Sequence, residues 1–368
     1  MQLLTLLAAG LTVLLIGVLA WRKATQPATL AAGAFRVGPY WVERKLGEGG
    51  MGTVFEGRHD TLGRRTAIKV IRPNVRDRDH EARFDREARL TSELSHPNTV
   101  AFYDYGRTDE GLRYYAMELV EGMTLSQLLK LEGPLPASRA LNILRQVAAS
   151  LAHAHAKGLV HRDIKPENIM LSHREGHPDW VKVLDFGLAK RLEGELILSS
   201  AGMQIGTPEF MAPEMIEGPL AVGPATDVYA VGVLAYCLLT GETPFQGRNL
   251  GEVLNAHRFE APIPPSLKRM AELPLDLERV VMNCLKKAPR DRYCDGFALL
   301  KALDACHCAP GAEQWSDEDA ERWWLRSLRA AAPSRGEGGA NCDARQRVTT
   351  PLREERRREG GVSSSCLS

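Results

Sequence analysis

The chain has 368 residues, of which 44% are hydrophobic and 25% are charged. These values are typical of a folded protein with one large domain or two ordinary ones, and they exclude a collagen, a coiled coil and a wholly disordered chain. Lys and Arg total 47 against 46 Asp and Glu, a net charge of +1 that argues against a dedicated nucleic-acid-binding protein. Seven cysteines without framework spacing do not indicate a disulfide-stapled secreted domain.

The first segment of the chain, Leu3–Ala20, is apolar and contains no charged residue. As a helix it would span roughly 27 Å, close to the hydrocarbon thickness of a bilayer. Arg22 and Lys23 follow it, so the positive-inside bias predicts a retained single-pass anchor in the cell (inner) membrane, with the downstream chain cytoplasmic. The alternative is a cleaved signal peptide, whose positive charges normally precede the apolar core. Residues 1–21 are therefore predicted as a transmembrane anchor and residues 22–38 as a juxtamembrane linker.

The pattern of the central region changes from strands to helices. Between residues 40 and 119, short β-branched or alternating stretches separated by glycines predict strands, with one helix at His80–Leu94. Between residues 124 and 305 helical periodicity dominates, as in Ala137–Lys157. A small β-rich part is thus followed by a larger α-rich part. The predicted strands are Val42–Leu46, Thr53–Arg58, Thr66–Ile71, Thr99–Tyr105 and Leu112–Leu119.

Two further segments follow the helical region. Ser316, with acidic residues after it, is a favourable N-cap for a helix that carries Trp323 and Trp324. We expect this accessory segment, residues 307–332, to pack on the main domain, with contact to a partner or a membrane as the alternative. Residues 333–368 are rich in Gly, Ser, Arg and Glu and are expected to be disordered, because they cannot bury enough apolar surface.

A glycine-rich loop lies between the first two predicted strands of the β-rich part. Glycines let backbone amides approach phosphate oxygens closely, although a glycine-rich hairpin gives the same pattern. A dinucleotide-binding fold would need a helix to begin here, whereas strand-like sequence continues, which disfavours that fold. The loop residues are Gly47, Glu48, Gly49, Gly50, Met51 and Gly52.

Lys69 lies within an otherwise apolar strand. A buried ammonium group requires an anionic partner, and Glu87 on the following predicted helix can supply one. The alternative is a lysine that faces solvent on an edge strand.

The remaining motifs are His161-Arg162-Asp163, with Lys165 and Asn168 after it, then Asp185-Phe186-Gly187 and Ala212-Pro213-Glu214. With the glycine loop, Lys69 and Glu87 they follow the order found in the eukaryotic-like protein kinases, which the chain resembles over about residues 40–303. The resemblance implies an α+β fold with two lobes. It places a kinase domain at residues 39–306, with an N-lobe at about 39–119 and a C-lobe at about 120–306, after the one N-terminal transmembrane helix.

The resemblance also implies the roles of individual residues. Asp163 would orient and deprotonate the acceptor hydroxyl, and Lys165 would contact the γ-phosphate of ATP. Lys69, held by Glu87, would bind the α- and β-phosphates. Asn168 and Asp185 would hold Mg²⁺, with Mn²⁺ as an alternative. The implied ATP-binding residues are Leu46, Gly47, Glu48, Gly49, Gly50, Met51, Gly52, Val54, Ala67, Lys69, Met117, Glu118 and Val120.

Acceptor class and regulation follow from the same resemblance. The spacing of Asp163, Lys165 and Asn168 resembles the serine/threonine branch, with Thr207 in the substrate loop near Asp163. Arg162 would pair with a phosphate on the activation segment. The predicted phosphorylation sites are Ser199 and Ser200, for which two solvated loop serines are the alternative, and the residues expected to be structural are Asp227, Glu214 and Arg292.

The sequence therefore predicts a membrane-anchored serine/threonine kinase that acts on proteins and is activated by autophosphorylation. Phosphorylation between two copies would involve a homodimer. The alternative is a catalytically weak pseudokinase or signalling scaffold, which usually lacks the strand lysine or one of the two motif aspartates. Lys69, Asp163 and Asp185 are all present here.

Overall fold

The computed structural model describes residues 35–49, 52–71, 89–174, 176–186, 207–218, 222–270, 272–307 and 314–331. The chain divides into two units at residue 325, and nearly all of the described residues belong to the first unit. Both lobes and the contacts of the last helix described below belong to the first unit.

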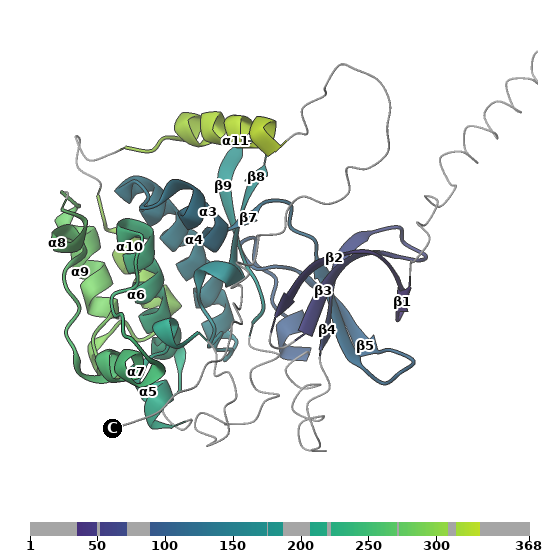
Figure 1. Cartoon of the computed structure of the whole chain (residues 1–368), viewed down its shortest axis with the longest axis horizontal. Helices are drawn as coiled ribbons and strands as arrows, with labels where there is room; N and C mark the ends of the chain where they lie inside the picture. Colours follow the sequence, from purple (N-terminus) through teal and green to yellow (C-terminus); the bar gives the residue numbers. More distant parts are fainter. Residues whose placement is uncertain are drawn as a thin grey trace, which may run out of the picture. The chain divides into compact units, whose positions relative to one another are not determined.

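The N-terminal lobe is one antiparallel sheet (Figure 1), in which six strands follow the order β1-β2-β3-β4-β6-β5. Gly49 pairs with Gly52, so the glycine loop forms the tip of the β2–β3 hairpin. A side chain at Gly52 would collide with the carbonyl group of Val70 on the neighbouring strand, which explains this glycine. The strands are β1 (Arg36–Val37), β2 (Tyr40–Gly49), β3 (Gly52–His59), β4 (Arg65–Ile71), β5 (Phe102–Arg107) and β6 (Arg113–Glu118).

The two faces of this sheet bury different apolar clusters. Because side chains alternate along a strand, β6 directs Tyr114 to one cluster and Tyr115 to the other. The Tyr115 cluster includes Ala67 and Met117, two residues predicted to bind ATP, and Val54 packs against it. Strand alternation also places Lys69 on this face, two positions from Ala67.

The larger lobe is built around α4 (Ala137–Ala156) and α6 (Pro224–Thr240), which pack against each other. Nearly every residue of α6 is buried. The surrounding helices are α3 (Leu125–Glu132), α5 (Pro213–Glu217), α7 (Leu250–Phe259), α8 (Pro265–Arg269), α9 (Leu275–Cys284) and α10 (Gly296–Asp304). A second sheet, in the order β7-β8-β9, contains β7 (Met123–Thr124), β8 (Ile169–Arg174) and β9 (His177–Val183). The predicted order of a β-rich part and then an α-rich part is confirmed.

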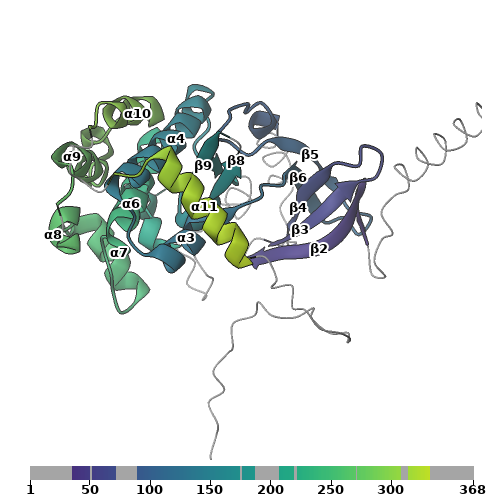
Figure 2. The same ribbon diagram turned by 90° about the horizontal axis from the view of Figure 1, so that it is seen from above.

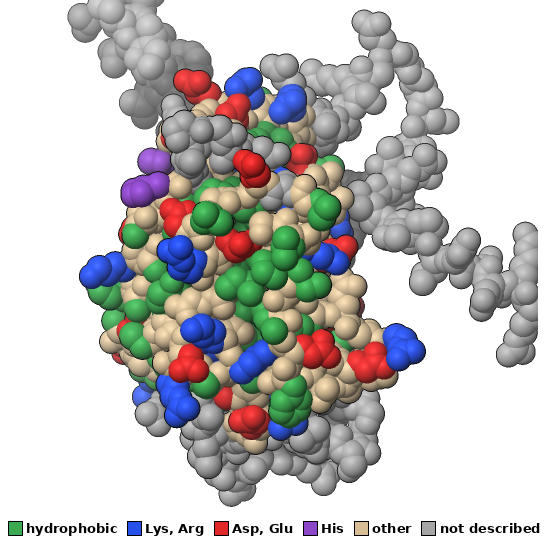
Figure 3. All heavy atoms as spheres, turned by 90° about the vertical axis from the view of Figure 1, so that its left-hand side faces the viewer, with side chains coloured by type: hydrophobic (Ala, Val, Ile, Leu, Met, Phe, Trp, Pro, Cys, Tyr) green, Lys and Arg blue, Asp and Glu red, His purple; other side chains and the backbone are tan. Residues whose placement is uncertain are grey.

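The surface of the helical lobe carries apolar side chains. Figure 3, viewed from the side of α8 and α9, shows them on this face with charged side chains around them. The most exposed of them in this part of the lobe are Phe259, Leu267, Met270 and Leu275. Exposed apolar groups of this kind are typical of protein contact sites.

The accessory helix is α11 (Asp317–Ala331), and it begins where the sequence predicts. The hydroxyl of Ser316 accepts a hydrogen bond of 3.1 Å from the backbone N–H of Asp319, which caps the helix. Trp323 and Trp324 are buried in the core of the helical lobe, so the predicted packing on the main domain is confirmed. The first turns of α11 contact α3, α4 and β9 (Figure 2).

Several sequence predictions fall outside the described residues. These are the anchor at residues 1–21, nearly all of the linker and the tail at residues 333–368. Within the described ranges, no helix is both long enough and apolar enough to cross a membrane. The predicted helix His80–Leu94 is described only from residue 89, and residues 89–92 are helical.

One predicted strand was placed too early. Thr99–Tyr105 was expected as a strand, but β5 begins at Phe102. Thr99 instead forms an isolated bridge with Val183, and the N–H of Val100 donates to the carbonyl of Val183 at 2.9 Å. These two residues therefore pair with the end of β9 in the other lobe, a contact that local sequence pattern does not encode.

Candidate active site

The lysine of β4 pairs with the aspartate that follows β9. Lys69 Nζ lies 2.6 Å from Asp185 Oδ2, and the two side chains are 10% and 23% exposed. The predicted partner of Lys69, Glu87, lies outside the described residues, so that pair stays a prediction. The ion pair brings together two residues that are far apart in the sequence and that come from different sheets.

The charges of this pair stabilise each other. Desolvation opposes the charge of Lys69, but the Asp185 carboxylate and Tyr115 outweigh it and raise the pKa of Lys69 above its ordinary value. Desolvation likewise favours neutral Asp185, but the charge of Lys69 and hydrogen bonds from Lys69 and Tyr115 lower the pKa of Asp185. Both groups are therefore ionised near neutral pH.

The loop between α4 and β8 brings the other predicted catalytic residues together. Asn168, in the short helix η1 (Pro166–Asn168), donates from Nδ2 to Asp163 Oδ2 at 2.9 Å and to the Asp163 carbonyl at 2.8 Å. Lys165 Nζ lies 3.2 Å from Asp163 Oδ2 and donates to Thr207 Oγ1, also at 3.2 Å. The Asp163 carboxylate is thus held by an amide and an ammonium group, and Lys165 links it to the substrate loop.

Asp185 and Asn168 have the chemistry of a magnesium site. The side-chain nitrogen of Asn168 is engaged by Asp163, which leaves its amide oxygen as the ligand atom. Among the described residues, each oxygen of Asp185 accepts one hydrogen bond, which leaves a second lone pair on each for a ligand. Carboxylate and amide oxygens are ligands that Mg²⁺ prefers, and such sites are usually completed by substrate phosphates and water. The residues present therefore fit a divalent metal.

Asp227, near the start of α6, supports the backbone of the catalytic loop. Its two carboxylate oxygens accept hydrogen bonds of 2.7 Å from the backbone N–H groups of His161 and Arg162. Arg162 has a φ of 65°, so this support holds it in a conformation that non-glycine residues rarely adopt. His155 Nδ1 accepts from the backbone N–H of Gly296 at 2.9 Å, so its Nε2–H donates to Asp227 Oδ2, also at 2.9 Å.

Glu214 and Arg292 form a second supporting contact. Two N–H groups of the Arg292 guanidinium each donate to one oxygen of Glu214 at 2.8 Å, and both side chains are buried. The hydroxyl of Thr226 donates to Glu214 at 2.8 Å. This bidentate pair joins the segment after the substrate loop to the helical lobe.

Glu118, the last residue of β6 and a predicted ATP-binding residue, is held through its side-chain carboxylate. Lys182 Nζ donates to Glu118 Oε2 at 2.6 Å, and Arg174 donates to Glu118 Oε1 at 3.1 Å. Lys182 belongs to β9 and Arg174 to β8, so two strands of the helical lobe hold the segment that connects the lobes. Val120 lies in the same connecting segment and packs against the Tyr115 cluster.

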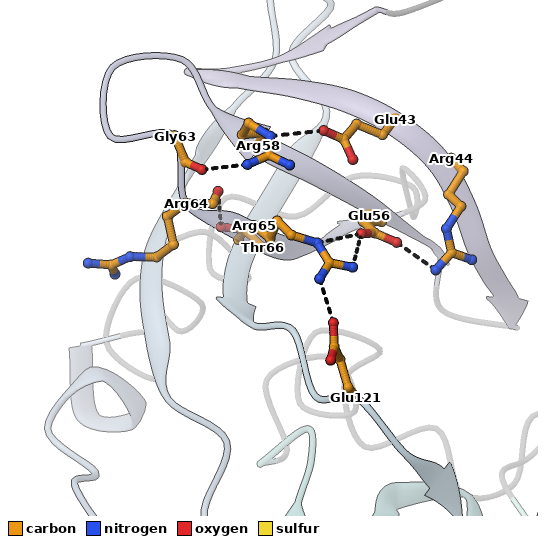
Figure 4. Close-up of polar contacts among 9 residues, drawn as sticks. All are labelled: Glu43, Arg44, Glu56, Arg58, Gly63, Arg64, Arg65, Thr66 and Glu121. Carbon is orange, nitrogen blue, oxygen red and sulfur yellow. Dashed lines mark hydrogen bonds and ion pairs between the residues drawn. The ribbon is translucent and has the colours of Figure 1, made fainter. Parts of the chain in front are cut away.

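Charged side chains from β2, β3 and β4 form a connected set that reaches Glu121 (Figure 4). Buried Glu56 accepts a hydrogen bond of 2.7 Å from Arg65 and forms an ion pair of 2.6 Å with Arg44. Arg65 pairs in addition with Glu121, just beyond the segment that connects the lobes. Strand alternation places Glu56 and Arg65 on the face that carries Val54 and Ala67.

Not every predicted site residue can be placed. Leu46, Gly47, Glu48 and Gly49 lie at the end of β2, and Leu46 is partly exposed. The predicted site residues outside the described ranges are Gly50, Met51, Glu87, Ser199 and Ser200.

Three residues at the site were not predicted from the sequence. Lys182 is a lysine within an apolar strand, the same signal that identified Lys69, so the sequence could have pointed to it. His155 lies in α4, 72 residues before Asp227, so its contact with Asp227 can be seen only in the fold. The hydroxyl of Tyr115 donates to Asp185 Oδ1 at 2.8 Å, and nothing in the sequence of β6 distinguishes this tyrosine from its neighbour Tyr114.

The geometry agrees with comparisons to known proteins. A model of the protein kinase domain matches residues 40–304. The chain belongs to the protein kinase family. The chain is similar to bacterial serine/threonine kinases: it is 41% identical over 271 residues to serine/threonine-protein kinase pkn3 of Myxococcus xanthus, covering 72% of this chain and 49% of the relative.

Other members of the family give the same result. The chain is 37% identical over 257 residues to serine/threonine-protein kinase PrkC of Bacillus subtilis (strain 168), covering 70% of this chain and 38% of the relative. The crystal structure of the Mycobacterium tuberculosis PknI kinase domain has a TM-score of 0.58 and 27% identity, covering 75% of this kinase and 99% of that domain. The chain thus spans about half the length of these curated relatives, or less.

Proposed function

We propose that this kinase transfers the γ-phosphate of ATP to serine and threonine hydroxyls of proteins. The observation that carries the proposal is the convergence of two groups of side chains. One is the Lys69–Asp185 ion pair, and the other is the linked set of Asp163, Lys165 and Thr207. Together they provide cations for phosphate, ligands for a divalent metal and a base for a hydroxyl group.

The chain's own residues have distinct roles in this reaction. Lys69 binds and orients the α- and β-phosphates, and Lys165 binds the γ-phosphate. Asp163 takes the proton of the acceptor hydroxyl, and the hydroxyl oxygen bonds to the γ-phosphorus. The bond between the γ-phosphorus and the β–γ bridging oxygen breaks, and ADP leaves. Asp185 and Asn168 hold the divalent metal, which neutralises phosphate charge when bound. We assign Mg²⁺ to this site, with Mn²⁺ as its substitute.

The location and regulation of the enzyme rest on the sequence. The apolar segment Leu3–Ala20 and the basic residues after it support a membrane anchor with the kinase domain on the cytoplasmic side. Arg162, next to the proposed base, supports activation by phosphate at Ser199 or Ser200. Phosphorylation between two copies of the chain would bring a homodimer into the activation step.

The test is phosphate transfer by the full chain in detergent, with labelled ATP, Mg²⁺ and protein acceptors. We expect label on serine and threonine, and transfer reduced by about 10³-fold or more in Asp163→Asn. Peptide mapping by mass spectrometry would show whether Ser199 and Ser200 carry phosphate. Absence of label with nucleotide binding retained would favour the scaffold alternative, and label on metabolite hydroxyls alone would contradict a protein substrate.

A further inference from the structure

A buried tyrosine contacts the aspartate proposed to bind metal, and the reaction scheme above does not use it. The hydroxyl of Tyr115 donates to Asp185 Oδ1 at 2.8 Å, while Lys69 donates to Asp185 Oδ2 at 2.6 Å. Among the described residues, each oxygen of this carboxylate therefore has its own donor. A carboxylate held at both oxygens cannot rotate about its last bond without losing one of these contacts.

The donor itself is fixed in position. Tyr115 is 2% exposed and lies in the middle of β6, which is paired on both sides by β4 and β5. Its ring stacks on Phe102, with the ring centroids 5.9 Å apart and the planes at 22°. A tyrosine hydroxyl carries its proton near neutral pH, so it is the donor and the carboxylate is the acceptor in this contact. The orientation of this hydroxyl is therefore set by the sheet before any ligand arrives.

The acceptor needs such support. Asp185 has a φ of 51°, in the left-handed region that non-glycine residues occupy at a cost in free energy. Lys69, its other donor, has a long flexible side chain and is expected to move when it binds phosphate. Tyr115 is the donor that can hold Asp185 in place while Lys69 changes partner.

We propose that Tyr115 is a positioning residue that orients the Asp185 carboxylate for the divalent metal. This inference rests on the proposed function, because it assigns the metal to Asp185. Hydrogen-bond donors behind a metal ligand typically change metal affinity by about 10- to 100-fold when they are removed. A donor also withdraws charge from the ligand oxygen, which acts in the opposite direction, and we expect the loss of orientation to be the larger effect.

The experiment is metal binding by the full chain carrying Tyr115→Phe, which removes the hydroxyl and keeps the ring. Mn²⁺ binding is measured by electron paramagnetic resonance at saturating ADP, so the readout does not depend on activity. We expect the Kd for Mn²⁺ to rise about 10-fold, with the affinity for metal-free ADP unchanged. Tyr114→Phe is the matched control, because it alters a buried tyrosine of the same strand on the opposite face, and its Kd should equal that of the unmodified chain.

A rescue variant separates positioning from packing. 4-Aminophenylalanine at position 115 restores an N–H donor on the same ring and should return the Kd for Mn²⁺ towards that of the unmodified chain. It also provides a test if Tyr115→Phe unfolds at the assay temperature. An unchanged or lower Kd in Tyr115→Phe, or an affinity that the amino variant fails to restore, would overturn the proposal. If the unmodified chain itself binds no Mn²⁺ with ADP, the proposed function fails instead.

Discussion

Two buried ion pairs of this kinase use the same chemistry for different purposes. Lys69–Asp185 lies between the lobes, and Arg139–Asp179 lies under the accessory helix. Both aspartates have a positive φ, 51° for Asp185 and 59° for Asp179, so each is held in an uncommon backbone conformation by its side-chain contacts. The pairs differ in how completely the carboxylate is satisfied.

Asp179 is saturated. Arg139 donates to both of its oxygens at 2.8 and 2.9 Å, and the indole N–H groups of Trp315 and Trp324 donate at 3.0 and 2.9 Å. The Arg139 guanidinium also lies 4.2 Å from the ring centroid of Trp315 and 4.4 Å from that of Trp323. The Arg139 and Asp179 side chains are only 2% and 1% exposed. This pair has no accessible lone pair for a ligand, so its contribution is to stability.

Asp185 has lone pairs to spare and is partly exposed. Its partners, Lys69 and Tyr115, each contribute one hydrogen bond. A partly exposed charge pair whose carboxylate can accept further contacts can exchange partners with phosphate and metal. The comparison indicates that the number of hydrogen bonds to the carboxylate, more than the burial of its charge, distinguishes a pair that can bind ligands from a pair that only stabilises the fold.

The largest expected effect is on activity, in Asp185→Asn. Removing the charge of the proposed metal ligand should reduce phosphate transfer by about 10³-fold or more. The melting temperature should fall less than in Asp179→Asn, because the Lys69 and Asp185 side chains are 10% and 23% exposed against 2% and 1% for Arg139 and Asp179. Labelled-ATP assays and thermal melting of the same preparation measure both quantities. A large loss of stability with residual activity would make Asp185 a structural residue, like Asp179, and would contradict the proposed difference between the two ion pairs.

Asp179→Asn should give the opposite result. Replacing this carboxylate leaves the Arg139 guanidinium buried without a charged partner, which typically lowers the free energy of unfolding by about 3–5 kcal/mol. Transfer per folded molecule should be unchanged. The control is Asp60→Asn, which breaks the exposed pair with Arg36 and should change the free energy of unfolding far less. Denaturant unfolding measures the difference, and equal effects for the two variants would contradict the structural assignment of Asp179.

The smallest effect is expected from removing one donor to the saturated pair. Trp324→Phe deletes the N–H that meets Asp179 and should lower the free energy of unfolding by about 1–3 kcal/mol. Trp41→Phe, in β2, is the control and should change it by about 0.5 kcal/mol or less. If Trp324→Phe is as stable as its control, the accessory helix does not stabilise the kinase through this pair.

The sequence identified the residues of one of these two ion pairs but not those of the other. Motif order identified Lys69 and Asp185 because phosphate chemistry requires particular side chains at recognisable spacings. Arg139 and Asp179 lie on a helix and a strand 40 residues apart, in stretches without a motif, so no local pattern connects them. Ser316 and the acidic turn after it did predict the start of α11, because helix capping depends on residues close in sequence.

The sequence by itself determined the family, the two lobes and the residues proposed for phosphate transfer, because these depend on residue type and on short-range periodicity. Only the tertiary structure decided which partners these residues meet. It placed Tyr115 against Asp185, His155 against Asp227 and Lys182 against Glu118. Each contact joins residues more than 60 positions apart, and the packing of the sheets and helices that brings them within hydrogen-bond distance is a property of the whole fold.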